Sequence, residues 1–141
     1  MEQYTTTCEK ETEALAERLG SRLCEGDILA FRGNLGAGKT AFTRGLAKGL
    51  GITDSVSSPT FALVHEYHGG RLPLYHFDMY RVEGIESLES TGFFDYLVMN
   101  GVLAIEWSEK ITDYLPEHTI FIEIEYKDEQ TRDVILKGGR F

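Results

Sequence analysis

The chain has 141 residues, of which 42% are hydrophobic and 11% aromatic, and its formal net charge is −9. This length predicts a single domain, and the hydrophobic fraction excludes a disordered chain. No stretch approaches the roughly 18 apolar residues of a membrane-spanning helix, and the first residues lack the basic and apolar segments of a signal peptide. We therefore expect a cytoplasmic protein with no membrane partner.

The negative charge is unevenly distributed along the chain. Residues 1–50 hold equal numbers of acidic and basic side chains, so the whole acidic excess lies beyond residue 50. An acidic surface repels a phosphate backbone, and we do not expect this chain alone to bind nucleic acid tightly. Two interpretations of the acidic face stay open: it keeps the protein soluble, or it docks on a basic protein partner.

The first third of the chain predicts two helices around a buried strand. Residues 8–24 have leucines at four-residue spacing with charges between them, which is typical of an amphipathic helix. Thr6 and Glu9 have the Thr-x-x-Glu spacing of a capping box just before it. Residues 28–31 form a short apolar run, which indicates a strand buried on both faces. A second helix is expected to end near Leu50.

Two hairpins are predicted in the rest of the chain. Residues 61–67 and 72–77 have strand character and are joined at a pair of glycines, which is a hairpin signal. Residues 119–126 alternate apolar and polar side chains and can pair with residues 134–136.

Between the hairpins we expect a helix over residues 85–98 and a second buried strand over residues 102–105. β-α-β units mixed with hairpins are typical of a three-layer α/β domain. The prediction is one domain over residues 1–141, with a mixed, mostly parallel central sheet and antiparallel hairpins.

A glycine-rich segment joins the first buried strand to the second helix, and it satisfies the P-loop pattern Gly-x-x-x-x-Gly-Lys-Thr at every defined position. Glycines let backbone N–H groups turn toward a polyphosphate, and the helix N-terminus adds its positive dipole end. Lys39 supplies a cation to the β- and γ-phosphates, and the Thr40 hydroxyl is a hard oxygen ligand for Mg²⁺. The domain is therefore predicted to be a P-loop NTPase. The expected nucleotide-binding residues here are Gly33, Asn34, Leu35, Gly36, Ala37, Gly38, Lys39, Thr40 and Ala41.

Two acidic residues follow strand-like segments and are candidates for the chemistry. P-loop enzymes place an acid after a second buried strand to hold Mg²⁺ or its water, and Glu106 fits that position. Asp78 ends another strand. Either it orients the attacking water or a Mg²⁺-bound water, or it is an ordinary turn residue. Thr40 and Glu106 are the predicted metal ligands, and Asp78, Glu106 and Lys39 are the predicted catalytic residues.

Two more positions have alternative interpretations. Thr60 lies in a Ser-Pro-Thr segment that either senses the γ-phosphate in a movable loop or forms a simple turn. Trp107 follows Glu106 directly and either packs in the core or lies beside the nucleotide.

Sequence features of related enzyme classes are absent from this chain. It has no Asn-Lys-x-Asp guanine motif, no arginine-rich lid of the small-molecule kinases and no obvious arginine finger. A P-loop domain without such a finger turns over slowly unless a partner completes its site. A small P-loop kinase and a non-catalytic nucleotide sensor are the alternatives to a slow ATPase.

Four segments in their order resemble the TsaE family, the bacterial ATPases of tRNA threonylcarbamoyladenosine biosynthesis. They are the P-loop, residues 58–61, residues 76–81 and residues 105–107. The P-loop alone is shared by a vast superfamily, whereas the four together are specific, and the resemblance runs along essentially the whole chain. Met79 stands where leucine is more frequent in the family, which is a conservative difference.

The resemblance implies a function that residue spacing alone does not indicate. The family takes part in modifying the adenosine next to the anticodon in tRNAs that read codons beginning with A. This chain is then expected to bind and hydrolyse Mg-ATP while docked on a heterodimer of the transferase subunit and its paralogue, resetting that complex between cycles. tRNA would contact the partners only. By the same resemblance Thr60 is the switch-loop residue, Trp107 lies close to the nucleotide, and Thr7 and Arg132 flank the adenine or ribose.

Overall fold

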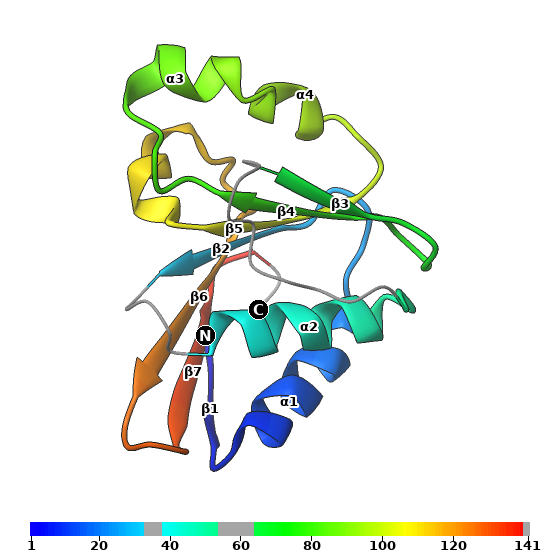
Figure 1. The fold of residues 1–141 in the computed structure, drawn as a ribbon, viewed down its shortest axis with the longest axis vertical. Helices are drawn as coiled ribbons and strands as arrows, with labels where there is room; N and C mark the ends of the chain where they lie inside the picture. The colour runs from blue at the N-terminus through cyan, green and yellow to red at the C-terminus, as the bar shows by residue number, and fades with distance from the viewer. Residues whose placement is uncertain (33–37, 54–63, 140–141) are drawn as a thin grey trace.

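A single mixed sheet forms the centre of the molecule. The structure is a computed structural model that describes residues 1–32, 38–53 and 64–139. Its strands are β1 (Glu2–Thr6), β2 (Ile28–Arg32), β3 (Val64–Tyr67), β4 (Leu74–Asp78), β5 (Val102–Glu106), β6 (Ile120–Tyr126) and β7 (Arg132–Lys137). They are arranged in the order β1-β7-β6-β2-β5-β4-β3 (Figure 1). The neighbours β6, β2, β5 and β4 run parallel, and the pairs β1/β7, β7/β6 and β4/β3 run antiparallel. This confirms the predicted α/β class with a mostly parallel centre.

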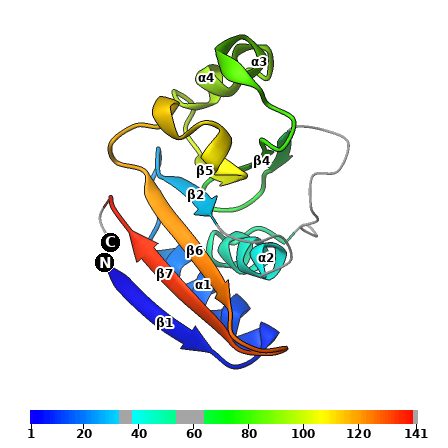
Figure 2. The same ribbon diagram turned by 90° about the vertical axis from the view of Figure 1, so that its left-hand side faces the viewer.

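Helices cover both faces of this sheet. α1 (Glu9–Ser21) and α2 (Lys39–Gly49) lie on one face, and α3 (Gly84–Ser90) and α4 (Phe93–Tyr96) lie on the other (Figures 1 and 2). The arrangement is the predicted three-layer sandwich. Among the described residues, no helix is both long enough and apolar enough to cross a membrane.

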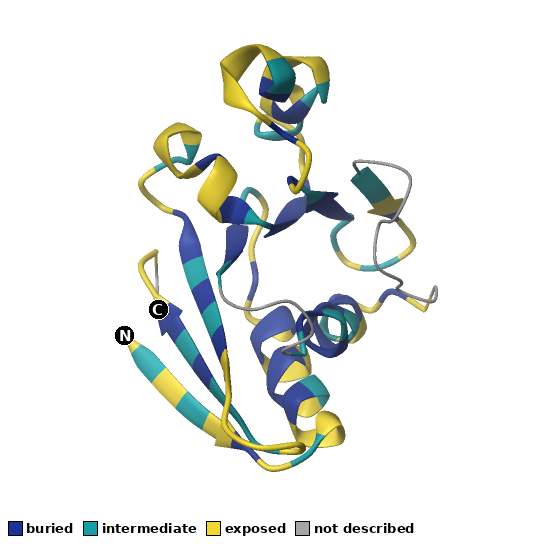
Figure 3. Ribbon diagram, turned by 60° about the vertical axis from the view of Figure 1, so that its left-hand side comes forward, coloured by how far each residue is buried: buried dark blue, intermediate teal, exposed yellow. Residues whose placement is uncertain are grey.

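The central strands are buried on both faces because their alternate side chains enter two different hydrophobic clusters. Leu29 and Phe31 of β2 pack in one cluster with Phe42 of α2. Ile28 of the same strand packs in the other cluster with Phe93 of α4. Successive side chains of a strand point to opposite faces, so each central strand serves both layers. Figure 3 shows the consequence: the central strands and α2 are mostly buried, and the outer surfaces of α3 and α4 are exposed.

β1 has no counterpart among the predicted elements. Its residues alternate between partly buried and exposed positions, and its sequence contains no apolar run. The strand exists because it pairs antiparallel with β7 over five residue pairs, from Glu2 opposite Leu136 to Thr6 opposite Arg132. An edge strand stabilised by a partner far along the chain leaves little local signal in the sequence.

The predicted capping box at the start of α1 is wrong. Thr6 belongs to β1, and α1 begins at Glu9 with Cys8 as its N-cap, which makes no side-chain capping bond. Glu11, the third residue of the helix, instead accepts bonds from the backbone N–H and the hydroxyl of Thr7. The hydrogen bonds of Glu11 to Thr7 also hold the pKa of the Glu11 carboxyl below its usual range. The contact that replaces the predicted capping box therefore runs in one direction only, from Thr7 to Glu11.

The predicted helix over residues 85–98 is broken into α3 and α4. Gly92 has a φ of 80°, in the left-handed region that favours glycine, and this backbone turn separates the two helices. Both predicted hairpins are confirmed as β3/β4 and β6/β7, although residues 61–63 of the first lie outside the described residues. Two 3₁₀ turns, η1 (Ser108–Lys110) and η2 (Thr112–Tyr114), connect β5 to β6 and were not among the predicted elements.

Candidate functional site

The ends of β4 and β5 bring two acidic residues together. These strands are parallel neighbours, and Asp78 lies directly opposite Glu106. Opposite residues in a sheet point to the same face. That face is the one covered by α1 and α2, because Ala104, two residues before Glu106, packs in their cluster. The carboxylates of β4 and β5 are therefore directed to the side where α2 begins.

A cavity with a volume of about 380 Å³ lies at this edge of the sheet. It is bounded by the end of β5, the first turn of α2, the start of α1 and the turn between β6 and β7. Lys39 and Glu106 line it although only 4% and 7% of their surfaces are exposed. Ionisable side chains are rarely this buried unless they are paired or functional. The other lining residues are Glu9, Thr12, Gly38, Thr40, Ala41, Arg44, Glu129, Gln130 and Arg132.

Trp107 connects the end of β5 to the lysine of the cavity. Its backbone has a φ of 60°. The Nζ atom of Lys39 lies 5.7 Å from the centre of the Trp107 ring, within range of a cation–π contact. The indole also packs against the ring of Tyr80, with the two ring centres 4.9 Å apart.

Glu106 is held from the neighbouring strand by a histidine. The Nε2 atom of His76 lies 2.7 Å from Oε2 of Glu106, and His76 is completely buried. Asp78, two residues further along β4, is partly buried, and its Oδ1 accepts a bond from the backbone N–H of Tyr80 at 2.9 Å. One oxygen of each carboxylate therefore has a fixed partner.

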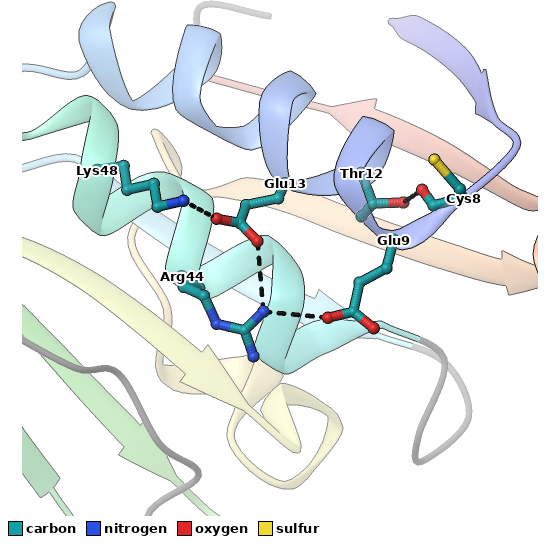
Figure 4. A network of polar contacts seen from close by, with 6 residues as sticks. All are labelled: Cys8, Glu9, Thr12, Glu13, Arg44 and Lys48. Atoms are coloured by element: carbon teal, nitrogen blue, oxygen red, sulfur yellow. Dashed lines mark hydrogen bonds and ion pairs between the residues drawn. The ribbon is translucent and has the colours of Figure 1, made fainter.

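A network of ion pairs joins α1 to α2 beside the cavity (Figure 4). The guanidinium of Arg44 donates to Glu9 at 3.1 Å and to Glu13 at 3.3 Å, and Lys48 donates to the other oxygen of Glu13. The Lys48 ammonium, with Arg44 adding to it, holds the pKa of Glu13 below its usual range. The bonds to Glu9 and Glu13 raise the pKa of Arg44. Arg44 thereby presents a fixed positive charge to the cavity wall.

Arg132 forms the opposite wall of the cavity. Its guanidinium carbon lies 4.7 Å from the centre of the Tyr126 ring, and Nη1 donates to the carbonyl oxygens of Asp128 and Thr131 at 2.6 and 3.0 Å. These contacts fix the side chain of Arg132 against the β6–β7 turn.

The structure brings most of the described predicted site residues to one place. The cavity is lined by Gly38, Lys39, Thr40, Ala41, Glu106 and Arg132. Trp107 and Asp78 adjoin it through Lys39 and Glu106, respectively. Thr7 is exposed and bonds to Glu11, and it does not line the cavity. The predicted residues Gly33, Asn34, Leu35, Gly36, Ala37 and Thr60 lie outside the described residues.

Other residues of the site were not predicted. Arg44 follows Thr40 by four residues and so lies on the same helix face, a spacing that would have identified it. His76 precedes Asp78 by two residues and so shares its face of the strand. Glu9, Thr12, Glu129 and Gln130 reach the cavity only through the packing of α1 and the β6–β7 turn, which no local pattern indicates.

The fold and the site together define a class. A helix that begins with Lys39 and Thr40 at the edge where parallel strands end is the arrangement by which P-loop proteins present a helix N-terminus to phosphate groups. With its parallel sheet centre and two helical layers, the chain has the α/β fold of a P-loop NTPase domain.

Comparison with known proteins defines the family within this class. The family model described as Threonylcarbamoyl adenosine biosynthesis protein TsaE matches residues 6–134. The TsaE protein of Bacillus subtilis is 41% identical over 140 residues, which cover 98% of this chain and 87% of that protein. The TsaE protein of Treponema pallidum is 41% identical over 118 residues, covering 84% and 87%. The crystal structure of Bacillus subtilis YdiB superposes with a TM-score of 0.76 and 34% identity, covering 94% of this chain and 82% of that one. The chain belongs to the TsaE family.

Proposed function

We propose that this chain is a Mg²⁺-dependent ATPase that serves the formation of threonylcarbamoyladenosine in tRNA as an accessory subunit. Membership of the TsaE family, which is named for this biosynthesis, supports the pathway. The observation that carries the ATPase activity is the shared cavity, in which Lys39 and Thr40 of α2 meet Glu106 of β5. A buried cation, a hydroxyl and a carboxylate at a helix N-terminus suit a nucleotide polyphosphate with its metal ion.

The donor atoms at this cavity fit Mg²⁺. Thr40 offers a hydroxyl oxygen and Glu106 a carboxylate oxygen, and both are hard ligands of the kind that Mg²⁺ prefers. Mg²⁺ commonly keeps several waters and takes only one or two protein ligands beside the phosphates, so this pair is sufficient. The described ranges contain no cluster of three or more His, Cys, Asp or Glu side chains that would form a metal cage of its own. When bound, the ion neutralises charge on the β- and γ-phosphates.

The remaining side chains orient the reactants. Lys39 contacts the phosphates from the first turn of α2, where the backbone N–H groups point in the same direction. Asp78 accepts a bond from the Tyr80 backbone with one oxygen and uses the other to orient the attacking water. Trp107 lies beside Lys39, with its ring centre 5.7 Å from Nζ, and offers the ammonium a cation–π contact.

The partner in this proposal is the heterodimer of the transferase subunit and its paralogue. The two arginines that line the cavity in the described part of the chain are held by this chain itself, Arg44 by Glu9 and Glu13 and Arg132 by the carbonyl oxygens of Asp128 and Thr131. Neither then serves as an arginine finger, so hydrolysis by the chain alone is slow and docking accelerates it. tRNA is bound by the partner subunits, because the acidic excess of this chain repels a phosphate backbone. ATP hydrolysis then resets the complex between modification cycles.

The test is Mg²⁺-dependent hydrolysis of ATP, with GTP as control, by the chain alone and with the purified heterodimer. We expect ATP-specific hydrolysis that the heterodimer strongly stimulates. Equal rates with and without the heterodimer would contradict the accessory role. Transfer of the γ-phosphate to an acceptor other than water would identify a kinase, and binding without turnover in the complex would identify a nucleotide sensor.

Lys39→Ala is the variant that tests the site, and Lys48→Ala on the same helix is its control with the same change in charge. Removing a charged hydrogen-bond donor to phosphate should weaken ATP binding at least about tenfold. Lys48 is bound to Glu13 on the helix surface, so Lys48→Ala should leave ATP binding unchanged. Equal ATP affinity of the Lys39→Ala variant and the wild type would remove Lys39 from the proposed site.

A further inference from the structure

His76 has a position that packing alone does not explain. Its imidazole is completely buried, and its one hydrogen bond among the described residues runs from Nε2 to Oε2 of Glu106. An ionised carboxylate only accepts hydrogen bonds, so Nε2 carries the proton and donates it. Nδ1 has no hydrogen-bond partner within the described part of the chain. Burying a polar ring that makes only one hydrogen bond costs free energy, so we expect that bond to have a role of its own.

The register of the sheet makes this contact specific. His76 lies opposite Ala104, and Glu106 lies two residues beyond Ala104 on the same face of β5. Ala104 is fully buried, and its side chain is only a methyl group. The side chain of Glu106 can therefore bond to the histidine across the alanine while also lining the cavity.

A glutamate at the end of a strand has several rotatable bonds, and its carboxylate can point in many directions. A bond to one oxygen removes most of this freedom and determines where the second oxygen points. Carboxylates that bind metal ions are commonly held in this way by a neighbouring hydrogen-bond donor.

We propose that His76 is a positioning residue for Mg²⁺, which holds Oε2 of Glu106 so that Oε1 is available to the ion or to its bound water. The inference rests on the proposed function and adds to it a residue that acts through Glu106. Removing a hydrogen bond of this kind typically costs roughly 10- to 100-fold in metal affinity or activity.

The test compares His76→Gln with His76→Asn. The amide nitrogen of glutamine reaches the position of the imidazole Nε2, whereas asparagine is one methylene shorter and does not reach Glu106. The readout is equilibrium binding of a fluorescent, non-hydrolysable ATP analogue as a function of Mg²⁺ concentration. We expect His76→Asn to require roughly 10- to 100-fold more Mg²⁺ and His76→Gln to remain close to the wild type. Analogue binding in EDTA should be the same for all three proteins.

A double-mutant cycle separates positioning from packing. In a Glu106→Gln background, His76→Asn should add no further loss of Mg²⁺ dependence, because the group it positions is already gone. Additive losses, equal losses in the Gln and Asn variants, or an equal loss in EDTA would each identify a merely structural histidine and overturn the proposal. A wild type whose analogue binding does not respond to Mg²⁺ would contradict the proposed function itself.

A measurement on the unmodified protein covers the case in which the variants do not fold. Nitrogen-15 spectra of the histidine side chains distinguish the two imidazole tautomers. We expect the Nε2–H tautomer for His76, with a shift of that nitrogen when Mg²⁺ is added to the analogue complex. An Nδ1–H tautomer, or no response to Mg²⁺, would overturn the proposal.

Discussion

Trp107 carries an unusual backbone conformation at the site. It is the only non-glycine residue with a positive φ in the described part of the chain, with φ and ψ of 60° and 41°. The left-handed region costs a non-glycine residue roughly 1–2 kcal/mol. The conformation turns the chain from β5 into η1, and the indole contacts both Tyr80 and Lys39. Strain retained at such a position is consistent with a functional role for the side chain.

The strain predicts that a glycine variant at residue 107 is more stable than an alanine variant, which is the reverse of the usual order. Alanine normally stabilises a chain relative to glycine, but at a positive φ the steric cost outweighs this advantage. We expect Trp107→Gly to be more stable than Trp107→Ala by roughly 0.5–1 kcal/mol. Urea denaturation of the nucleotide-free proteins measures the difference. An alanine variant as stable as the glycine variant would show that the backbone at residue 107 relaxes when the indole is removed.

The pair formed by Tyr96 and Glu66 makes a pH-dependent contribution to the free energy of unfolding. The hydroxyl of Tyr96 in α4 donates to Oε2 of Glu66 in β3 at 2.6 Å. The bond to the Glu66 carboxylate, aided by burial, raises the pKa of Tyr96 from 10.0 to about 12. Bonds from Tyr96 and His68 lower the pKa of Glu66 from 4.5. The bond between α4 and β3 is therefore strongest while the tyrosine is protonated and the glutamate is ionised.

Tyr96→Phe isolates this bond because the ring and its contacts with Tyr75 and Phe77 remain. Because the pKa of Tyr96 is raised, the stability that its hydroxyl adds is fully present below pH 10 and is lost as the pH rises from 10 to about 12. Because the pKa of Glu66 is lowered, the stability that its carboxylate adds is present above pH 4.5 and is lost as the pH falls below that value. Because the Glu66 side chain is 43% exposed, the variant should be less stable by about 1 kcal/mol or less.

Denaturation of the wild type and of Tyr96→Phe across this pH range is the measurement. The difference in the free energy of unfolding should be largest between about pH 5 and pH 10 and should shrink on both sides. A difference that does not change with pH would assign the effect to packing of the ring.

At the scale of elements, close packing of α1 against α2 holds the start of α2 in place. A Cβ atom added at Gly45 would lie 2.2 Å from the backbone oxygen of Glu13 and 2.6 Å from Cβ of Ala16. Backbone atoms cannot move aside as a flexible side chain can. The two helices therefore approach each other at a distance that only glycine permits at this position.

Gly45→Ala should consequently lower the free energy of unfolding by about 1–3 kcal/mol, although alanine favours a helix by about 1 kcal/mol over glycine. Lys48→Ala removes an ion pair between the same helices, and Lys48 is 53% exposed, so its cost should be below about 1 kcal/mol. Urea denaturation of both variants measures the contrast. A Gly45→Ala protein more stable than the wild type would show that the helices can separate at little cost.

Local patterns predicted those elements whose stabilising contacts lie nearby. The buried strands β2 and β5, the amphipathic α1 and the two hairpins have a clear periodicity or turn signal, and they are confirmed. β1 escaped prediction because its partner, β7, lies at the far end of the chain. The break between α3 and α4 depends on one glycine that a helical pattern tolerates, and only the backbone angle of Gly92 reveals it.

In the whole molecule, the site too combines residues that local sequence patterns predict with residues that only long-range pairing places. Lys39, Thr40 and Glu106 were predicted from a motif and a strand end, and all three line one cavity. The pairing of His76 with Glu106 depends on the register between β4 and β5, which neither strand's sequence specifies by itself. Residues whose role depends on long-range register or packing therefore had to be found in the structure.

The acidic excess has a place on the molecule that suits docking. Glu86, Glu89 and Asp95 lie exposed on α3 and α4, the layer on the opposite face of the sheet from α1 and α2. Large apolar side chains are exposed on the same segment, Phe94 at 37% and Val98 at 87%. Apolar groups surrounded by charges of one sign are typical of an interface with a partner of opposite charge.

Reversal of these charges tests whether this layer is the docking surface for the heterodimer. The triple variant Glu86→Lys, Glu89→Lys, Asp95→Lys should bind the heterodimer at least about tenfold more weakly at low salt, because like charges would then face each other. The loss should diminish as salt screens the charges.

Reversal of Glu109, Asp113 and Glu117, which are exposed on the β5–β6 connection, changes the net charge equally and should have a much smaller effect. Surface plasmon resonance at two salt concentrations measures both. Equal losses in the two triple variants would reduce the effect to overall charge, and unchanged binding of the first would leave the acidic layer with solubility as its role.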